Sequence, residues 1–468
     1  MHEGRRVTVM GLGRFGGGLG VTRYLARAGA EVLVTDMAPA EQLAEPVAAL
    51  DDLVRTGRVT LRLGEHNVSD FTRTDLVVAN PAVPKPWENR FLRAAEAAGV
   101  AITTEIRLAL ERLPDPARTI GITGSAGKST TSAMIAHTLA ALGVPAVLGG
   151  NIGGSLLEAD PPAPRAWTVL ELSSAMLYWL GPGRAGRGEE GHAAARVGGW
   201  SPGIAVVTNI TPNHIDWHGA FEHYRESKLN IVRFRRGPCV CGEDSALRAS
   251  LAGAGAGELV GVSAEERGDR FRLADGPLAV PGAHNRLNAR MALQAIGLAL
   301  RADGDARSDA DLALSASAAL ATFPGLPHRL QLVATIGGVR YYNDSKCTTP
   351  EAALLAIAAL RESGIDAVHL IAGGYDKGSD LGPVAAAAAR LAGLYTIGAT
   401  GPTLAEAARQ ADGTAHVDEC GTLDIAVALA SVRACPGEAV LLSPACASWD
   451  QFTNYEARGE RFAAMVRG

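Results

Sequence analysis

Residues 123–130 have the composition of a phosphate-binding loop. They read Thr-Gly-Ser-Ala-Gly-Lys-Ser-Thr, after an apolar run that ends at Ile122 and before a helical stretch over residues 131–142. Glycines let backbone N–H groups close around phosphate oxygens, Lys128 can reach the outer phosphates, and the Ser129 hydroxyl can ligate Mg²⁺. The start of a helix adds partial positive charge. The loop predicts a nucleoside triphosphate site, although Ile122 stands where the usual motif has glycine.

Acidic and imidazole side chains follow two further predicted strands. Glu171 ends the first of these, where an acid is well placed to hold Mg²⁺. After the second, residues 208–219 read Thr-Asn-Ile-Thr-Pro-Asn-His-Ile-Asp-Trp-His-Gly. Because His214, Asp216 and His218 alternate, they cannot all face one way in an extended segment, and no fourth zinc ligand is evident. One interpretation is that these residues border a nucleotide or metal site. The other is that Glu171 caps a helix and that the histidine is structural.

The last third of the chain has three similar strand ends. Asn-Asp-Ser-Lys at 343–346, Gly-Gly-Tyr-Asp-Lys-Gly at 373–378 and Ser-Pro-Ala-Cys-Ala-Ser at 443–448 each follow an apolar run. Lysines, hydroxyls and backbone donors at such positions suit an anion. These segments predict a pocket for an anionic substrate, with tight turns of no further function as the alternative.

The N-terminal segment predicts a βαβ unit. A strand over residues 7–10 leads into Gly-Leu-Gly-Arg-Phe-Gly at 11–16, a helix over 19–28 and a strand over 31–35 that ends at Asp36. By this motif alone the unit is typical of a dinucleotide-binding site.

The order of elements predicts an α/β protein of three domains. Continuous apolar strands separated by helices favour parallel sheets covered on both faces. Prolines near residue 114 and the turn-rich segment 323–327 place the boundaries, so we expect a Rossmann-like domain at 1–113, a central ATPase-type parallel sheet at 114–325 and a second Rossmann-like domain at 326–468.

Lys228 lies on a predicted helix, where the local pattern alone indicates a solvated lysine. Residues 181–203, rich in Gly and Arg, predict a surface loop.

Composition narrows the class of protein. A net charge of −5 gives no general attraction to nucleic acid. The six cysteines have no zinc spacing, which favours free thiols in a reducing compartment. No run of 18 or more apolar residues and no signal-peptide core are present, so we expect a soluble cytoplasmic protein without membrane insertion.

Taken together and in order, these motifs resemble the Mur ligases of peptidoglycan synthesis. The resemblance runs through the segments 123–130, 150–153 (Gly-Asn-Ile-Gly), 171–174 (Glu-Leu-Ser-Ser), 213–216 (Asn-His-Ile-Asp), 227–229 (Ser-Lys-Leu), 284–289 (His-Asn-Arg-Leu-Asn-Ala), 325–329 (Gly-Leu-Pro-His-Arg), 343–346 and 441–448 (Leu-Leu-Ser-Pro-Ala-Cys-Ala-Ser). Each motif alone is weak, whereas the ordered set is specific. The last three are similar to those of the glutamate-adding members.

The resemblance implies an ATP-dependent amide ligase. Such an enzyme phosphorylates the carboxylate of UDP-N-acetylmuramoyl-L-alanine to an acyl phosphate, which the amine of D-glutamate then attacks. Carboxylate is a poor electrophile, so catalysis is mainly alignment and charge neutralisation. We expect a monomer whose partners are these small molecules.

The resemblance also implies a role for each matching residue. Lys128, His214 and Lys228 are the expected catalytic residues. Two Mg²⁺ ions are expected on Ser129, Glu171, His214 and Lys228, with Lys228 carbamoylated into an anionic oxygen ligand, which suits a desolvated lysine of lowered pKa. The expected ATP-binding residues are Gly124, Ser125, Ala126, Gly127, Lys128, Ser129, Thr130, Asn285, Asn288, Arg329 and Asp344.

The two remaining substrates have matching residues as well. The expected contacts to the UDP-substrate are Gly13, Arg14, Phe15, Asp36, Asn151 and His214, which demotes the dinucleotide interpretation of the glycine motif. The expected contacts to glutamate are Lys346, Thr348, Lys377, Ser448 and Tyr455. Trp449 and Tyr455 stand where the family more often has Leu and Phe. The alternatives are a sister ligase that adds L-glutamate, and a nucleotide-binding regulatory protein or dehydrogenase fused to an NTPase.

Overall fold

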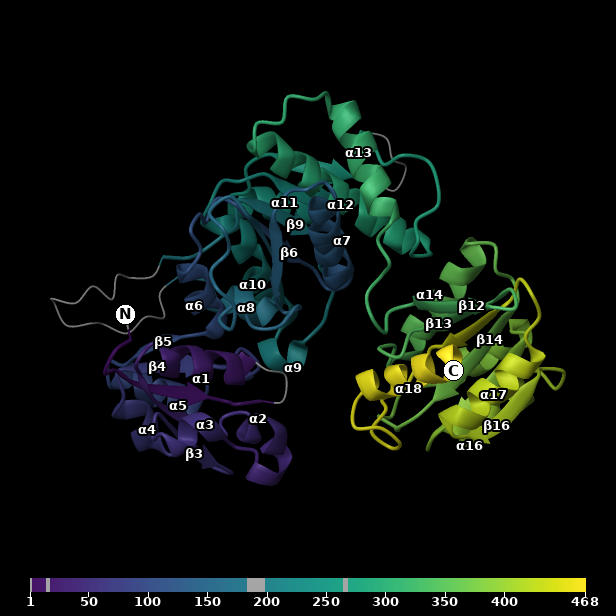
Figure 1. The fold of residues 1–468 in the computed structure, drawn as a ribbon, viewed down its shortest axis with the longest axis horizontal. Helices are drawn as coiled ribbons and strands as arrows, with labels where there is room; N and C mark the ends of the chain where they lie inside the picture. The colour runs from purple at the N-terminus through teal and green to yellow at the C-terminus, as the bar shows by residue number, and fades with distance from the viewer. Residues whose placement is uncertain (1, 14–16, 183–197, 264–267) are drawn as a thin grey trace. The chain divides into compact units, whose positions relative to one another are not determined.

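The computed structural model describes residues 2–13, 17–182, 198–263 and 268–468, and three separate sheets organise them (Figure 1). The chain forms two compact units: residues 1–274 with 288–319, and residues 275–287 with 320–468. Two sheets belong to the first unit and the third belongs to the second. The predicted α/β class is confirmed, while the domain boundaries at 113/114 and 325/326 stay predictions. Among the described residues, no helix is long and apolar enough to cross a bilayer.

The first sheet has five parallel strands in the order β3-β2-β1-β4-β5. Its strands are β1 (Arg6–Met10), β2 (Glu31–Asp36), β3 (Val59–Leu63), β4 (Leu76–Ala79) and β5 (Ala101–Thr103). Its helices are α1 (Gly17–Arg27), α2 (Ala44–Ala48), α3 (Asp51–Arg55), α4 (Val68–Thr72), α5 (Arg90–Ala97) and α6 (Glu105–Glu111), with a short 3₁₀ helix at Ala40–Leu43. The predicted βαβ start is confirmed, and Arg14, Phe15 and Gly16 of its glycine motif lie outside the described residues.

The second sheet has six parallel strands in the order β11-β10-β9-β6-β8-β7. Its strands are β6 (Thr119–Thr123), β7 (Ala146–Gly150), β8 (Trp167–Glu171), β9 (Ile204–Val207), β10 (Cys239–Gly242) and β11 (Leu259–Val262). The helices in this part of the chain are α7 (Lys128–Ala141), α8 (Ser174–Trp179), α9 (Ile215–His218), α10 (Phe221–Arg233), α11 (Ser245–Ala254), α12 (Ala283–Ala302) and α13 (Asp309–Ala321). Most of the predicted loop at 181–203, residues 183–197, lies outside the described residues.

The third sheet has six strands in the order β12-β13-β17-β14-β15-β16. Its strands are β12 (Gln331–Ile336), β13 (Val339–Asn343), β14 (Val368–Gly373), β15 (Gly393–Ile397), β16 (Val417–Gly421) and β17 (Ala439–Leu442). Its helices are α14 (Pro350–Glu362), α15 (Gly382–Ala387), α16 (Gly401–Ala411), α17 (Leu423–Arg433) and α18 (Tyr455–Arg467), with a 3₁₀ turn at Ala388–Arg390.

The expectation of purely parallel sheets is wrong for one strand. The edge strand β12 pairs antiparallel with β13 through a turn at Gly337 and Gly338, both with positive φ. Leu332 and Ile336 on this strand are exposed. A two-residue glycine turn joins antiparallel strands, so β12 and β13 form a hairpin. The other strand pairs of this sheet are parallel.

Apolar side chains cover both faces of the third sheet. One face packs a cluster that includes Leu370, Leu394 and Leu441, and the other packs a cluster that includes Ile371 and Leu442. All five side chains are fully buried. Successive strand residues point to opposite faces, so the continuous apolar run of β17 supplies both clusters.

We expect Leu441→Ala to lower the free energy of unfolding by about 2–5 kcal/mol, because it leaves a cavity in the middle of β17. Urea unfolding followed by far-UV circular dichroism measures the change. The matched control is Val432→Ala on α17, where the side chain is 85% exposed, and its effect should stay within about 0.5 kcal/mol. Equal effects of the two substitutions would contradict the assignment of β17 to the core.

Candidate active site

The phosphate loop, Glu171 and the segment after β9 lie at one edge of the second sheet. Strand β6 lies between β9 and β8, and all three run parallel. Their carboxyl ends therefore meet at the same edge, where ligands of open α/β sheets bind. The structure thus brings together residues that are far apart in the sequence.

The glycines of the phosphate loop adopt conformations that other residues rarely take. Gly124 has φ of +156° and Gly127 has φ of +81°. A Cβ on Gly124 would lie 1.8 Å from Thr208 Oγ1, and one on Gly127 would lie 2.6 Å from Asn288 Oδ1. Close approach of neighbouring side chains to the loop backbone therefore requires glycine at both positions.

Thr208 and Asn209 anchor the loop, and sequence reasoning missed both. Asn209 Oδ1 accepts hydrogen bonds from the backbone N–H groups of Ser125 (3.1 Å) and Ala126 (3.0 Å). The Thr208 hydroxyl donates to the Ala126 carbonyl at 2.6 Å. Their only sequence signal was their place directly after a predicted strand.

Two lysines donate to the same carbonyl oxygen of this loop. Lys128 Nζ, at the start of α7, lies 2.9 Å from Gly124 O and 3.2 Å from Ser125 O. Lys228 Nζ, on α10, lies 2.9 Å from Gly124 O and 3.1 Å from Thr123 Oγ1. The two ammonium groups therefore occupy one small volume.

Lys228 is buried, so the solvated lysine that its local pattern indicates is wrong. Only 2% of it is exposed, and its ammonium lies 4.7 Å from the ring centroid of Tyr224, one helical turn earlier. Burial lowers the pKa of Lys228 well below its ordinary value, and the charge of Lys128 lowers it further, while Glu171 acts in the opposite direction. Both main effects disfavour the charged ammonium.

Glu171 presents one unpaired carboxylate oxygen at this edge. The side chain is 2% exposed, its Oε1 accepts a hydrogen bond from Asn151 Nδ2 at 3.0 Å, and its Oε2 has no hydrogen-bond partner. A buried anionic oxygen without a partner is costly unless a cation or donor binds it. Together with the Ser129 hydroxyl on α7, it fits the oxygen ligands that Mg²⁺ prefers.

The segment after His214 forms a short helix, so the alternation that an extended segment would give does not apply. His214 takes a left-handed conformation (φ +50°) and precedes the single-turn helix α9. Partial burial of the ring lowers the pKa of His214, and the charge of Lys128 lowers it further. His218 contacts Ser174 Oγ through Nε2 and His223 through Nδ1, both at 2.9 Å. Among the described residues, no group of three or more His, Cys, Asp and Glu side chains could hold a metal.

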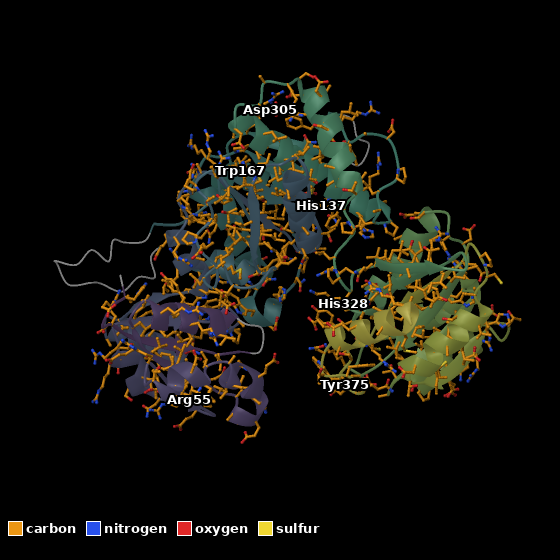
Figure 2. All side chains as sticks on the ribbon, in the orientation of Figure 1. Arg55, His137, Trp167, Asp305, His328 and Tyr375 are labelled. Atoms are coloured by element: carbon orange, nitrogen blue, oxygen red, sulfur yellow. The ribbon has the colours of Figure 1, made fainter. Side chains whose placement is uncertain are left out.

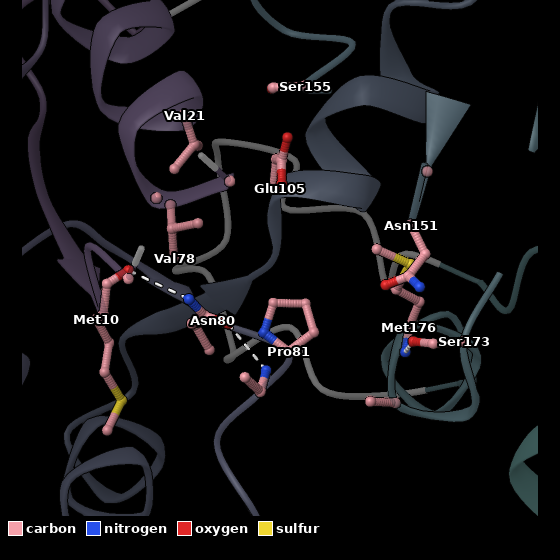
Figure 3. A pocket seen from close by; sticks show the side chains of 18 of the residues that line it. Met10, Val21, Val78, Asn80, Pro81, Glu105, Asn151, Ser155, Ser173 and Met176 are labelled. Carbon is pink, nitrogen blue, oxygen red and sulfur yellow. Dashed lines mark hydrogen bonds between the residues drawn. The ribbon is translucent and has the colours of Figure 1, made fainter. Parts of the chain in front are cut away.

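A pocket of about 710 Å³ lies between the first and second sheets (Figure 3). Its lining includes Gly13, Asn151 and His214, three of the residues expected to contact the UDP-substrate. Asp36 is not among the lining residues; its carboxylate accepts hydrogen bonds from the backbone N–H groups of Gly13 (3.1 Å) and Ala38 (2.8 Å). Asp36 thus fixes the turn after β1.

Two lining residues of this pocket had no sequence signal. Asn80, after β4, donates to Gly11 O and accepts from the Ala82 N–H, the two bonds that are drawn in Figure 3. Glu105 begins α6 beside Ser155, and burial raises the pKa of its carboxyl. The hydrogen bonds of Asn80 and the burial of Glu105 depend on the fold, and no local sequence pattern indicates either of them.

The three predicted anion-binding segments of the third sheet also lie at one edge. Strands β13, β17 and β14 are neighbours and parallel, so residues 343–346, 443–448 and 373–378 follow adjacent carboxyl ends. Ser448 is buried, whereas Lys346 and Lys377 are exposed. Thr348 precedes α14, and Tyr455 begins α18.

The expected ATP-binding residues outside the phosphate loop lie in both compact units. Asn288, on α12, lies in the first unit beside Gly127, while Asn285, one turn earlier, lies in the second unit and donates to Pro281 O at 2.7 Å. Asp344 accepts from the Leu330 N–H at 3.0 Å and from the Ser443 hydroxyl at 2.8 Å. Burial raises the pKa of Asp344 to about 6, against the effect of these bonds and of the Arg329 charge.

This fold and the phosphate loop define a nucleotide-binding α/β protein, and comparison with known proteins places it in a family. The Mur ligase MurD-like N-terminal domain matches residues 5–104, the Mur ligase middle domain matches 122–296, and the Mur ligase glutamate ligase domain matches 328–446. UDP-N-acetylmuramoylalanine–D-glutamate ligases are 35% identical in Acidobacterium capsulatum and 37% identical in Roseiflexus sp.. Each alignment covers 99% of this chain, and 96% and 98% of the respective relative. The chain belongs to the Mur ligase family.

Solved structures agree on the fold. The UDP-N-acetylmuramate-alanine ligase MurC of Thermotoga maritima has a TM-score of 0.60 at 18% identity, over 99% of both chains. The MurF ligase of the same organism, in complex with ADP, has a TM-score of 0.53 at 16% identity, over 99% of this chain and 94% of that one. Similarity at this level of identity supports the architecture alone.

The raised pKa of Asp344 predicts how stability depends on pH. The folded protein keeps a proton on this carboxyl up to about pH 6, whereas the unfolded chain releases it near pH 4. The carboxyl therefore makes folding less favourable as the pH rises through this window. We expect the wild type to lose stability relative to Asp344→Asn between about pH 4 and pH 6.5, measured by urea unfolding at matched pH.

Asp424→Asn provides a control of opposite sign. A hydrogen bond from Arg461 lowers the pKa of Asp424, so its contribution to stability is lost as the pH falls. A difference between wild type and Asp344→Asn that does not vary with pH would contradict the raised pKa.

Proposed function

We propose that this protein is a cytoplasmic, ATP-dependent ligase that adds D-glutamate to UDP-N-acetylmuramoyl-L-alanine in peptidoglycan precursor synthesis, acting as a monomer. The proposal rests on one observation of the site: the Lys128 ammonium, the buried Lys228 amine and an unpaired buried carboxylate oxygen lie at the ends of β6 and β8. This arrangement suits a polyphosphate with its Mg²⁺. The full-length identity to D-glutamate ligases supports the choice of substrates.

The first half of the proposed reaction transfers a phosphoryl group. Lys128 and the loop N–H groups of residues 124–130 hold the polyphosphate, and Lys128 neutralises charge on the γ-phosphoryl. An oxygen of the substrate carboxylate attacks the γ-phosphorus, the bond to the bridging oxygen breaks, and ADP leaves. The products are an acyl phosphate and ADP.

The second half forms the amide bond. Glutamate is oriented through its two carboxylates by Lys346, Thr348, Lys377, Ser448 and Tyr455. Its neutral amine attacks the acyl carbon, the tetrahedral intermediate expels inorganic phosphate, and the amine loses a proton. Alignment of amine and acyl carbon supplies most of the acceleration.

We also propose two Mg²⁺ ions and a carbamate on Lys228. Ser129 and Glu171 would hold one ion, and His214 with carbamoylated Lys228 the other. Mg²⁺ supplies charge neutralisation for the phosphates. The lowered pKa of Lys228 supports the carbamate, because a neutral amine is the form that combines with CO₂.

The remaining roles follow the same proposal. Asn285, Asn288, Arg329 and Asp344 would contact ATP, and Gly13, Asp36, Asn151 and His214 the UDP-substrate. Arg14 and Phe15 are proposed with the latter group from the sequence alone.

The choice of glutamate enantiomer tests the proposed function directly. With UDP-N-acetylmuramoyl-L-alanine, ATP and Mg²⁺, we expect phosphate release and a new UDP-linked dipeptide with D-glutamate, and a far lower rate with L-glutamate. Phosphate assay and mass spectrometry measure the two products. Turnover with L-glutamate alone would establish the sister ligase instead, and NAD binding without an effect of the UDP-substrate would favour the dehydrogenase fusion.

Removal of the Lys228 side chain tests the carbamate. We expect Lys228→Ala to lower kcat by at least about 100-fold and short carboxylic acids such as formate or acetate to restore part of it, since a free carboxylate can take the place of the carbamate oxygens. Lys128→Ala is the matched control, which the same acids should not rescue. Undiminished activity of Lys228→Ala would remove Lys228 from the site.

A further inference from the structure

Two lysines at the edge of the third sheet each lie over an aromatic ring. The Lys377 ammonium is 4.3 Å from the ring centroid of Trp449, and the Lys346 ammonium is 5.1 Å from that of Tyr455. Among the described residues, the Lys377 ammonium has no hydrogen bond or ion pair. Within the described residues, the face of the Trp449 indole is therefore the one group in contact with this ammonium that attracts its positive charge.

Trp449 is unusually exposed for so large an apolar side chain. It is 60% exposed, and its neighbour Tyr375, labelled in Figure 2, is 42% exposed. The two rings pack against each other at 5.6 Å between centroids. An exposed aromatic pair beside a lysine is typical of a recognition site rather than of a core.

The backbone around Trp449 is fixed on both sides. The Tyr375 N–H donates to Ala447 O at 2.9 Å, which ties the loop after β14 to the loop after β17. On the other side, the Phe452 N–H donates to Ser448 O at 2.8 Å, and Asp450 accepts from the Ala399 N–H at 2.9 Å. The indole therefore has a rigid base from which to hold a flexible lysine.

We propose that Trp449, supported by Tyr375, is a positioning residue that holds the Lys377 ammonium ready for a carboxylate of the amino-acid substrate. The inference rests on the proposed function, in which Lys377 contacts glutamate. When the carboxylate binds, the ammonium pairs with it without first losing the freedom of a long side chain. Because the Lys377 side chain is already ordered, the amino-acid substrate binds more tightly, while the affinities for ATP and the UDP-substrate are unaffected.

Steady-state kinetics of two substitutions test this role. Trp449→Leu removes the ring but keeps apolar volume, and Trp449→Phe keeps a weaker aromatic face. We expect the KM for D-glutamate to rise about two- to fivefold in Trp449→Leu and less in Trp449→Phe. The KM values for ATP and the UDP-substrate, and the melting temperature, should stay at their wild-type values, as in the surface control Val432→Ala.

Fluorescence gives a second measurement that does not depend on turnover. The chain has six tryptophans, so a change in emission is assigned to Trp449 when the Trp449→Phe variant, at saturating D-glutamate, lacks it. We expect D-glutamate, added to the full-length enzyme with ADP and the UDP-substrate, to change the Trp449 emission as the ammonium pairs with the carboxylate. L-glutamate at the same concentration should cause less change.

Each outcome decides the inference separately from the proposed function. A wild-type enzyme that does not use D-glutamate overturns the proposed function. A wild-type enzyme that does, combined with an unchanged KM for D-glutamate in Trp449→Leu, equal rises in the Leu and Phe variants, or parallel rises for ATP, overturns the role of Trp449. Wild-type emission that follows that of Trp449→Phe throughout the titration overturns it as well.

Discussion

Two ammonium groups converge on the carbonyl oxygen of Gly124, and the rest of the central site depends on this constraint. Lys128 and Lys228 reach that oxygen from different helices, each at 2.9 Å. Positive charges so close together repel, and burial makes the repulsion stronger. The carbonyl can serve both because Thr208 and Asn209 fix the loop that carries it. Repulsion from Lys128 and burial together lower the pKa of Lys228, so the charged form of Lys128 and the neutral amine of Lys228 can share this oxygen.

Parallel sheets explain how distant motifs reach such positions. Each strand that ends at the same edge brings its following residues to that edge, whatever the sequence separation. In the second sheet, β6, β8 and β9 carry the loop, Glu171 and Thr208 there. In the third sheet, β13, β14 and β17 do the same for Lys346, Lys377 and Ser448. The predicted site residues are thereby placed by strand order, while helices and turns between them can vary.

Sequence patterns predicted the elements well where one local cause decided the structure. The strands predicted at 7–10 and 31–35 lie within one residue of β1 and β2, because each is an apolar run next to turn residues. The single turn of helix at Ile215–His218 has no counterpart among the predicted elements, since four residues are too few to show a helical period. The burial of Lys228 and the bonds of Asn209 and Asn80 depend on residues distant in sequence. Only the resemblance to a family indicated Lys228, only its place after a predicted strand indicated Asn209, and nothing indicated Asn80.

The environments of Lys228 and Lys377 show why residue type alone does not define a role. Lys228 is buried among hydroxyl and carbonyl oxygens beside a second ammonium, which favours the neutral amine and its reaction with an electrophile such as CO₂. Lys377 is exposed, and the face of an indole attracts its ammonium as a cation. The first environment favours a nucleophilic amine, and the second holds an ammonium over an aromatic ring at the surface. Burial in one case and a neighbouring π-system in the other, rather than residue type, therefore set what each lysine can do.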